Sequence, residues 1–134
     1  MHYFTAELPP IALVVGDLAR LETLASAATK RGAPAAEFLA QEIARASVVG
    51  GPEVLSGLVR MGSHVLYRDD VSGEERAVTL VYPDKADIAQ GRVSVLTPLG
   101  AALIGLSISQ SIEFQTPSGG RRSITVLDVK EPQG

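Results

Sequence analysis

A short apolar strand that turns directly into a helix, at residues 92–105, constrains the fold of this chain more than any other stretch. Residues 93–96 read as the strand. Thr97 can cap the helix that follows, because its hydroxyl can accept a hydrogen bond from an otherwise unpaired amide. Pro98 suits the first helical position, where no N–H is needed, and Gly105 is placed to end the helix in the left-handed conformation. The residue types alone therefore predict a strand–helix unit of the core.

The N-terminal part of the chain predicts a short helical hairpin. Residues 11–15 form an apolar run that is either a strand or a segment that holds down the N-terminal arm, and we favour the strand. Residues 18–30 and 34–46 then carry apolar side chains at helical spacing, with Glu42 and Arg45 expected to face water. The connection between them is short, so the helices should run antiparallel. Two arms of about 15 residues would each be roughly 22 Å long.

A glycine–proline turn at residues 50–52 is interpreted as a hinge between two units. Residues 1–52 would hold the N-terminal arm and the hairpin, and residues 53–134 would form a second domain. Apolar and polar side chains alternate in several short runs of this domain, as in antiparallel strands. The runs are residues 64–68, 75–81, 93–96, 111–115 and 122–129. The prediction is an α+β chain in which four or five antiparallel strands pack on one short helix.

The composition of the chain excludes several classes of function. The chain has no cysteine, which excludes disulfides and zinc sites of the thiolate type. Its formal net charge of −3 argues against nucleic acid as the main partner, since phosphate binding needs a basic surface. No apolar run approaches the roughly 20 residues that span a bilayer, and the N-terminus lacks the pattern of a signal peptide. We expect a soluble, cytoplasmic, monomeric protein with no metal or cofactor.

Five segments of the chain carry motifs in a specific order. They are MGSHV at 61–65, SGEE at 72–75, TLVYPDKADI at 79–88, GRVSVLTPLGAALIG at 91–105 and TPSGG at 116–120. Together they resemble the C-terminal domain shared by the bacterial transcription factors GreA and GreB, over about residues 58–129. The short N-terminal part and the LVYP segment at 80–83 are most similar to the regulators of nucleoside diphosphate kinase (Rnk), truncated relatives of the Gre factors. The resemblance implies an FKBP-like sheet wrapped on the short helix.

The resemblance also implies a partner, RNA polymerase. The Gre factors enter its secondary channel with a long helical hairpin, and acidic residues at the hairpin tip hold a magnesium ion for transcript cleavage. Here the tip, residues 29–34, contains Lys30 and Arg31 and no carboxylate. Because Mg²⁺ requires oxygen ligands and the hairpin is short, we expect a regulator that does not stimulate cleavage and is not an enzyme.

The polymerase contact of this family includes the corner before the short helix, and it matches Leu96, Thr97, Pro98 and Leu99 here. Leu96 departs from the polar residue that the Gre factors carry at this position. The resemblance therefore implies a polymerase-binding site at these four residues.

Other functions are open on the sequence alone. An FKBP-like peptidyl-prolyl isomerase, or another protein-binding module, would be consistent with the expected fold, but this is an analogy of fold. An isomerase pocket requires clustered aromatic side chains, and the second domain offers only Tyr67, Tyr82 and Phe114. Regulation of nucleoside diphosphate kinase could be direct or a consequence of transcription.

Overall fold

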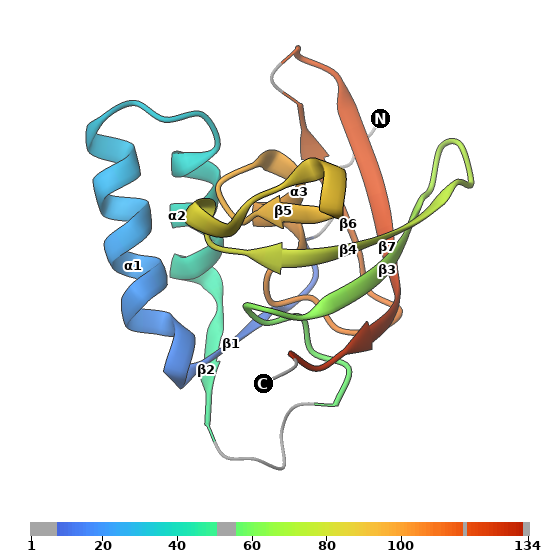
Figure 1. Ribbon diagram of the computed structural model, residues 1–134, viewed down its shortest axis with the longest axis horizontal. Helices are drawn as coiled ribbons and strands as arrows, with labels where there is room; N and C mark the ends of the chain where they lie inside the picture. Colours follow the sequence, from blue (N-terminus) through green and yellow to red (C-terminus); the bar gives the residue numbers. More distant parts are fainter. Residues whose placement is uncertain (1–7, 51–55, 117, 133–134) are drawn as a thin grey trace, which may run out of the picture.

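The computed structural model describes residues 8–50, 56–116 and 118–132. A helical hairpin lies beside a curled sheet that wraps one short helix (Figure 1). The elements in chain order are β1 (Ala12–Val14), α1 (Val15–Lys30), α2 (Ala36–Arg45), β2 (Ser47–Val49), β3 (His64–Asp69), β4 (Glu75–Val81), the 3₁₀ helices η2 (Pro83–Lys85) and η3 (Ile88–Gln90), β5 (Arg92–Ser94), α3 (Pro98–Leu103), β6 (Ser111–Gln115) and β7 (Arg121–Lys130).

The strand favoured near the N-terminus is confirmed as β1, and it pairs in parallel with β2, which the sequence did not reveal. Residues 47–49 therefore leave the helical pattern, and α2 has only 10 residues. The two arms are unequal: α1, with 16 residues, is about 24 Å long, and α2 is about 15 Å long.

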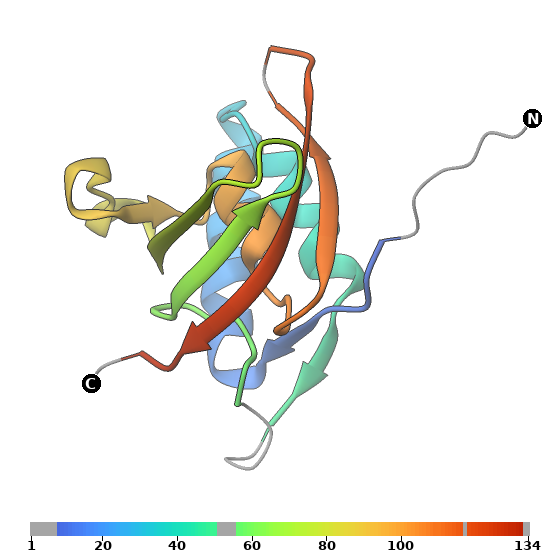
Figure 2. The ribbon, with the colours of Figure 1, turned by 90° about the vertical axis from the view of Figure 1, so that its right-hand side faces the viewer.

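The main sheet has the strand order β5-β4-β3-β7-β6. Three of its pairings are antiparallel, as expected, but β5 pairs with β4 in parallel, with Thr79 opposite Arg92. The parallel edge arises because residues 83–91 carry the chain back far enough for β5 to pair with the last three residues of β4. This connecting segment projects from the body in Figure 2. The fold is thus α+β, and the prediction of a wholly antiparallel sheet was wrong at this one edge.

One apolar cluster contains residues from both halves of the chain. Leu21 and Leu39 of the hairpin and Leu103 of α3 are fully buried in it. The hairpin also meets the sheet through Phe38 and Phe114, whose stacked rings have centroids 6.2 Å apart. The hairpin therefore packs against the body. The expected hinge at residues 50–52 lies largely outside the described residues, so the division into two units stays a prediction.

Glu42 was expected to face water, and this was wrong, because its exposed fraction is 2%. It shares a helical face with Leu39, three residues earlier, which is buried in the core. Arg45 compensates the buried carboxylate with a bidentate ion pair at 2.8 Å. The same guanidinium donates to the carbonyl oxygen of Pro9. The pair thus ties α2 to the segment before β1.

Candidate protein-docking site

The corner between β5 and α3 is held by short polar contacts. Thr97 Oγ1 accepts the N–H of Gly100 at 3.0 Å and donates to the carbonyl oxygen of Ser94 at 2.7 Å. Ser94 Oγ in turn accepts the N–H of Leu96 at 3.0 Å. The helix begins at Pro98. The predicted cap and the predicted first helical residue are therefore confirmed.

Gly100 allows α3 to lie directly on the end of β5. A Cβ atom at this position would be 2.1 Å from the carbonyl oxygen of Ser94, which is backbone and cannot rotate away. The sequence does not reveal this requirement, because a glycine inside a helix carries no sign of what lies opposite it. Gly105 has φ +85°, so the left-handed end of the helix is confirmed.

The four predicted docking residues are consecutive in the chain, at the corner before α3, and all are half-buried. Leu96 and Leu99 also pack partly against the core. Thr97 and Leu99 line one surface hollow, and Pro98 lines a second. The corner is thus an accessible ridge between two depressions. A binding role for these residues stays a prediction.

The first depression, which we call the β4–β5 hollow, has a volume of about 580 Å³. Its lining includes Tyr67, Val78, Ile88, Arg92, Thr97 and Leu99. Ile88 has an exposed fraction of 89%, high for a large apolar side chain. Such a side chain next to an apolar hollow is typical of an interaction surface.

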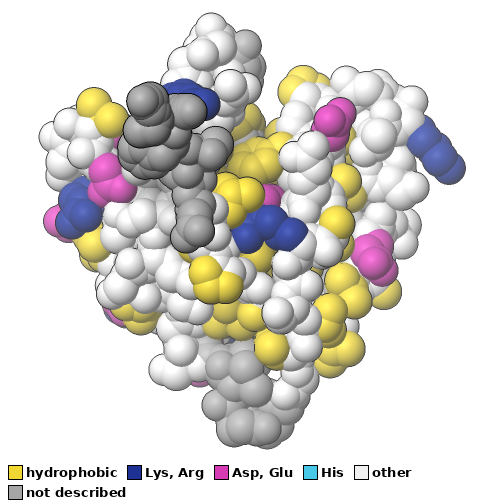
Figure 3. All heavy atoms as spheres, turned by 180° about the vertical axis from the view of Figure 1, so that it is seen from behind, with side chains coloured by type: hydrophobic (Ala, Val, Ile, Leu, Met, Phe, Trp, Pro, Cys, Tyr) yellow, Lys and Arg dark blue, Asp and Glu magenta, His cyan; other side chains and the backbone are white. Residues whose placement is uncertain are grey.

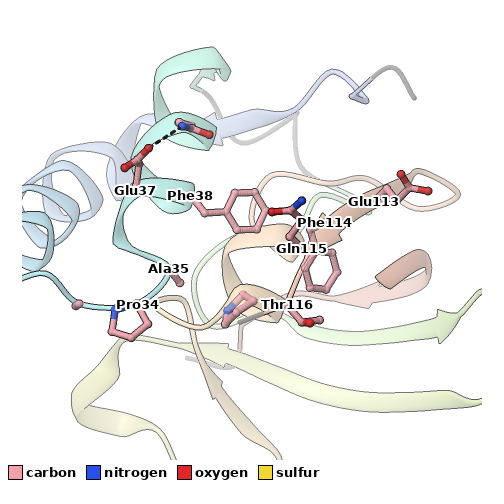
Figure 4. Close-up of a pocket in the computed structure, with 11 residues that line it drawn as sticks. Pro34, Ala35, Glu37, Phe38, Glu113, Phe114, Gln115 and Thr116 are labelled. Carbon is pink, nitrogen blue, oxygen red and sulfur yellow. Dashed lines mark hydrogen bonds between the residues drawn. The ribbon is translucent and has the colours of Figure 1, made fainter. Parts of the chain in front are cut away.

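The second depression, the α2–β6 groove, has a volume of about 550 Å³. Its lining includes Pro34, Glu37, Phe38, Pro98, Glu113 and Phe114 (Figure 4). From the back, the surface is hollowed between the hairpin and the β6–β7 edge, and apolar side chains gather there (Figure 3). The groove therefore joins the hairpin turn to the corner between β5 and α3, which the sequence could not show.

The hairpin tip is compact and basic. Lys30 and Arg31 are both exposed. The turn uses positive φ angles at Gly32 (69°) and at Ala35 (68°). Residues 29–34 contain no carboxylate, and the described part of the chain contains no group of three histidine, aspartate or glutamate side chains that could hold a metal ion. The hairpin tip therefore carries positive charge, whereas the ligands of a metal ion there would be negatively charged carboxylates.

Polar contacts fix α1 against the body. Asp17 Oδ2 accepts the N–H of Met61 at 3.0 Å, and the Arg20 guanidinium lies 3.7 Å from the centre of the Tyr82 ring. Burial raises the pKa of Asp17, and the hydrogen bond from Met61 and the charge of Arg60 oppose this rise only in part. Burial, with the charge of Asp17, also raises the pKa of Tyr82. The hairpin is thus anchored on two sides, here and at the α2–β6 groove.

No helix within residues 8–50, 56–116 and 118–132 combines the length and the apolar character that crossing a membrane would require.

The sequence matches two family models. One is described as "Transcription elongation factor, GreA/GreB, C-term" and covers residues 55–131. The other is described as "Rnk N-terminus" and covers residues 9–49. The chain therefore belongs to the GreA/GreB family of transcription elongation factors, as its motifs predicted.

Individual relatives agree with this assignment. The chain is 34% identical over 122 residues to the regulator of nucleoside diphosphate kinase of Escherichia coli K12, with 91% of this chain and 90% of the relative covered. It is 37% identical over 92 residues to the elongation factor GreA of Syntrophobacter fumaroxidans, with 69% of this chain and 58% of that relative covered. The chain thus spans little more than half of that GreA. These relatives are named as regulators or transcription factors, not as enzymes.

A solved structure supports the same placement. The GreA/GreB elongation factor from Nitrosomonas europaea superposes with a TM-score of 0.71 at 36% identity, with 90% of this chain and 99% of that chain covered. The predicted combination of a short hairpin with a curled sheet is therefore a known arrangement in this family.

Proposed function

We propose that this chain is a bacterial transcription regulator that binds RNA polymerase near the secondary channel, through Leu96, Thr97, Pro98 and Leu99, and does not stimulate transcript cleavage. The observation that carries the proposal is the corner itself, which is both rigid and accessible. Thr97 is hydrogen-bonded on both sides of the turn. Thr97 and Leu99 open onto one hollow, and Pro98 opens onto the other.

A rigid corner favours binding because little conformational entropy is lost on docking. Pro98 fixes its own φ angle, and the contact between Gly100 and Ser94 leaves α3 no room to shift towards β5. Leu96 and Leu99 add apolar area. The charged residues lining the adjacent β4–β5 hollow are Arg76 and Arg92, so the partner surface should combine apolar and acidic side chains.

The absence of cleavage stimulation rests on the hairpin. A tip that delivers a metal ion needs carboxylate oxygens, whereas Lys30 and Arg31 are cationic. The hairpin is also short, about 24 Å along α1, and α2 packs against the body through Phe38 and Phe114. Charge and length support the same conclusion independently.

A pull-down of core RNA polymerase with the purified chain tests binding. The chain should retain the polymerase, and the combined changes Thr97→Asp and Pro98→Ala should abolish retention. Aspartate is itself a good N-cap, so the double variant should fold. Val71→Asp is the matched control, because Val71 is 83% exposed in the β3–β4 turn, away from the corner. If the intact chain fails to retain the polymerase, the proposal is wrong.

A halted elongation complex tests the second part. Addition of the chain should leave the transcript at its original length, and so should the variant with Lys30→Asp and Arg31→Asp, because the hairpin remains short. Shortening of the RNA by the unmodified chain would contradict the proposal.

Proline isomerisation is not favoured by the geometry. Tyr67 lies at the β4–β5 hollow and Phe114 at the α2–β6 groove, while Tyr82 is covered by Arg20. The three aromatic side chains therefore do not converge on one pocket.

A further inference from the structure

Strand β6 forms one edge of the main sheet. Its hydrogen-bonded neighbour is β7, with Ser111 opposite Thr125 and Gln115 opposite Arg121. Proteins commonly protect such edges with lysine, proline or a bulge. Residues 111–115 contain neither lysine nor proline, and their register with β7 has no shift. At the opposite edge, β5 has only three residues. The edge of β6 is thus the longer of the two and lacks these protections.

The direction of the free backbone groups follows from the register. Thr116 donates its N–H to the carbonyl oxygen of Gly120, and Val126 donates to that of Gln110. In an antiparallel pair, hydrogen-bonded and non-hydrogen-bonded positions alternate. Residues 112 and 114 therefore bond to β7. The N–H and C=O groups of residues 111, 113 and 115 point away from it.

The α2–β6 groove runs beside this edge. Glu113, Phe114 and Gln115 of β6 line it from one side, and Glu37 and Phe38 of α2 line it from the other (Figure 4). Phe38 and Phe114 provide apolar surface in its lining. With a volume of about 550 Å³, the groove has room for apolar side chains of a strand laid along β6.

The charge of the groove selects the occupant. Its charged lining residues are Glu37 and Glu113, and both are exposed. Glu113 is paired with Arg121 at 2.9 Å, and no ion pair involves Glu37 within the described residues. A second copy of the chain, paired antiparallel about Glu113, would place two glutamates opposite each other, which is unfavourable. A strand that carries lysine or arginine would be favoured instead.

We propose that the free edge of β6 is a docking site for an extended segment of a partner protein in which basic and apolar residues alternate. The segment adds a strand to the sheet, as in known peptide recognition by strand addition. Its apolar side chains enter the α2–β6 groove beside Phe38 and Phe114, and its basic side chains lie on the opposite face of the sheet with Glu113. The exposed Glu37 adds a second negative charge to the groove lining. The proposal does not depend on polymerase binding, although Pro98 borders both sites.

The experiment is an NMR titration of the full-length chain with a short blocked peptide in which lysine and valine alternate. The backbone amide signals of Glu113 and Gln115 should shift, and their hydrogen exchange should slow, because they gain partners. Glu37→Lys should weaken binding between about threefold and tenfold. The matched control is Glu22→Lys, an exposed glutamate on α1 that does not line the groove, and it should leave the affinity unchanged.

Two further peptides decide the mechanism. A version with N-methyl groups at alternate residues cannot pair as a strand and should not bind, and a version with glutamate in place of lysine should bind much more weakly. The proposal would be overturned if either peptide bound as tightly as the original lysine–valine peptide. It would also be overturned if the lysine–valine peptide at millimolar concentration shifted no β6 amide signal. A dimer of the chain alone with protected β6 amides would overturn it as well. Thr97→Asp should leave peptide binding intact, so a failure of polymerase binding is distinguishable from a failure here.

Discussion

At the scale of single residues, the proposed docking corner depends on two buried residues outside its four docking positions, Ser94 and Gly100. Ser94 accepts the Thr97 hydroxyl through its carbonyl oxygen and the Leu96 amide through its own hydroxyl. Gly100 lets that carbonyl approach the helix. The conformation of the corner is therefore set before any partner binds, and a change at these positions should act on the fold first.

We predict that Gly100→Ala lowers the free energy of unfolding by about 1–3 kcal/mol or more, because the added methyl group would overlap backbone atoms of Ser94. Urea unfolding followed by circular dichroism measures this. Gly16→Ala is the control: a Cβ atom there meets nothing within 4 Å, and in α1 it should be neutral or stabilising by up to about 1 kcal/mol. Equal stability of the two variants would refute the steric argument.

At the scale of elements, the position of the hairpin depends on a few polar contacts. α1 is anchored through Asp17 and Arg20, and α2 through Arg45, which donates to the carbonyl oxygen of Pro9. These contacts join segments far apart in sequence. They therefore set where the hairpin lies relative to the sheet, whereas apolar spacing predicts only that the helices form.

Asp17 gives this anchor a predictable pH dependence. The pKa of Asp17 is raised in the folded chain above the ordinary 3.8. The unfolded chain therefore releases this proton at a lower pH than the folded chain does. As the pH rises and Asp17 ionises, the free energy of unfolding falls. Asp17→Asn, which keeps an acceptor for Met61, should therefore gain stability relative to the unmodified chain between about pH 3 and pH 7. Urea midpoints across this range test it, and a difference that does not change with pH would contradict it.

At the scale of the whole molecule, the hairpin and the sheet share one apolar cluster. Leu13, Leu21 and Leu39 from the first part and Leu103 from the second belong to it. Neither part can keep its buried surface without the other, and the loss of that surface would cost about 1.5–3 kcal/mol for each large side chain.

We therefore expect a single unfolding transition. Far-ultraviolet circular dichroism, to which α1 and α2 contribute most of the helix signal, should change at the same urea concentration as the tyrosine fluorescence, to which Tyr67 and Tyr82 of the sheet region contribute. An earlier loss of the helical signal would favour two separable units, joined at the hinge that the sequence of residues 50–52 predicts.

The sequence by itself determined the local features of this protein: the cap at Thr97, the proline start and glycine end of α3, the two helices, and the family. These depend on neighbours within a few residues, so residue type and spacing carry them. The tertiary structure alone decided the pairing of β1 with β2, the parallel edge at β5, the burial of Glu42, and the groove between α2 and β6. Each of these joins segments distant in sequence, and the free energy of such contacts depends on packing that no local pattern records.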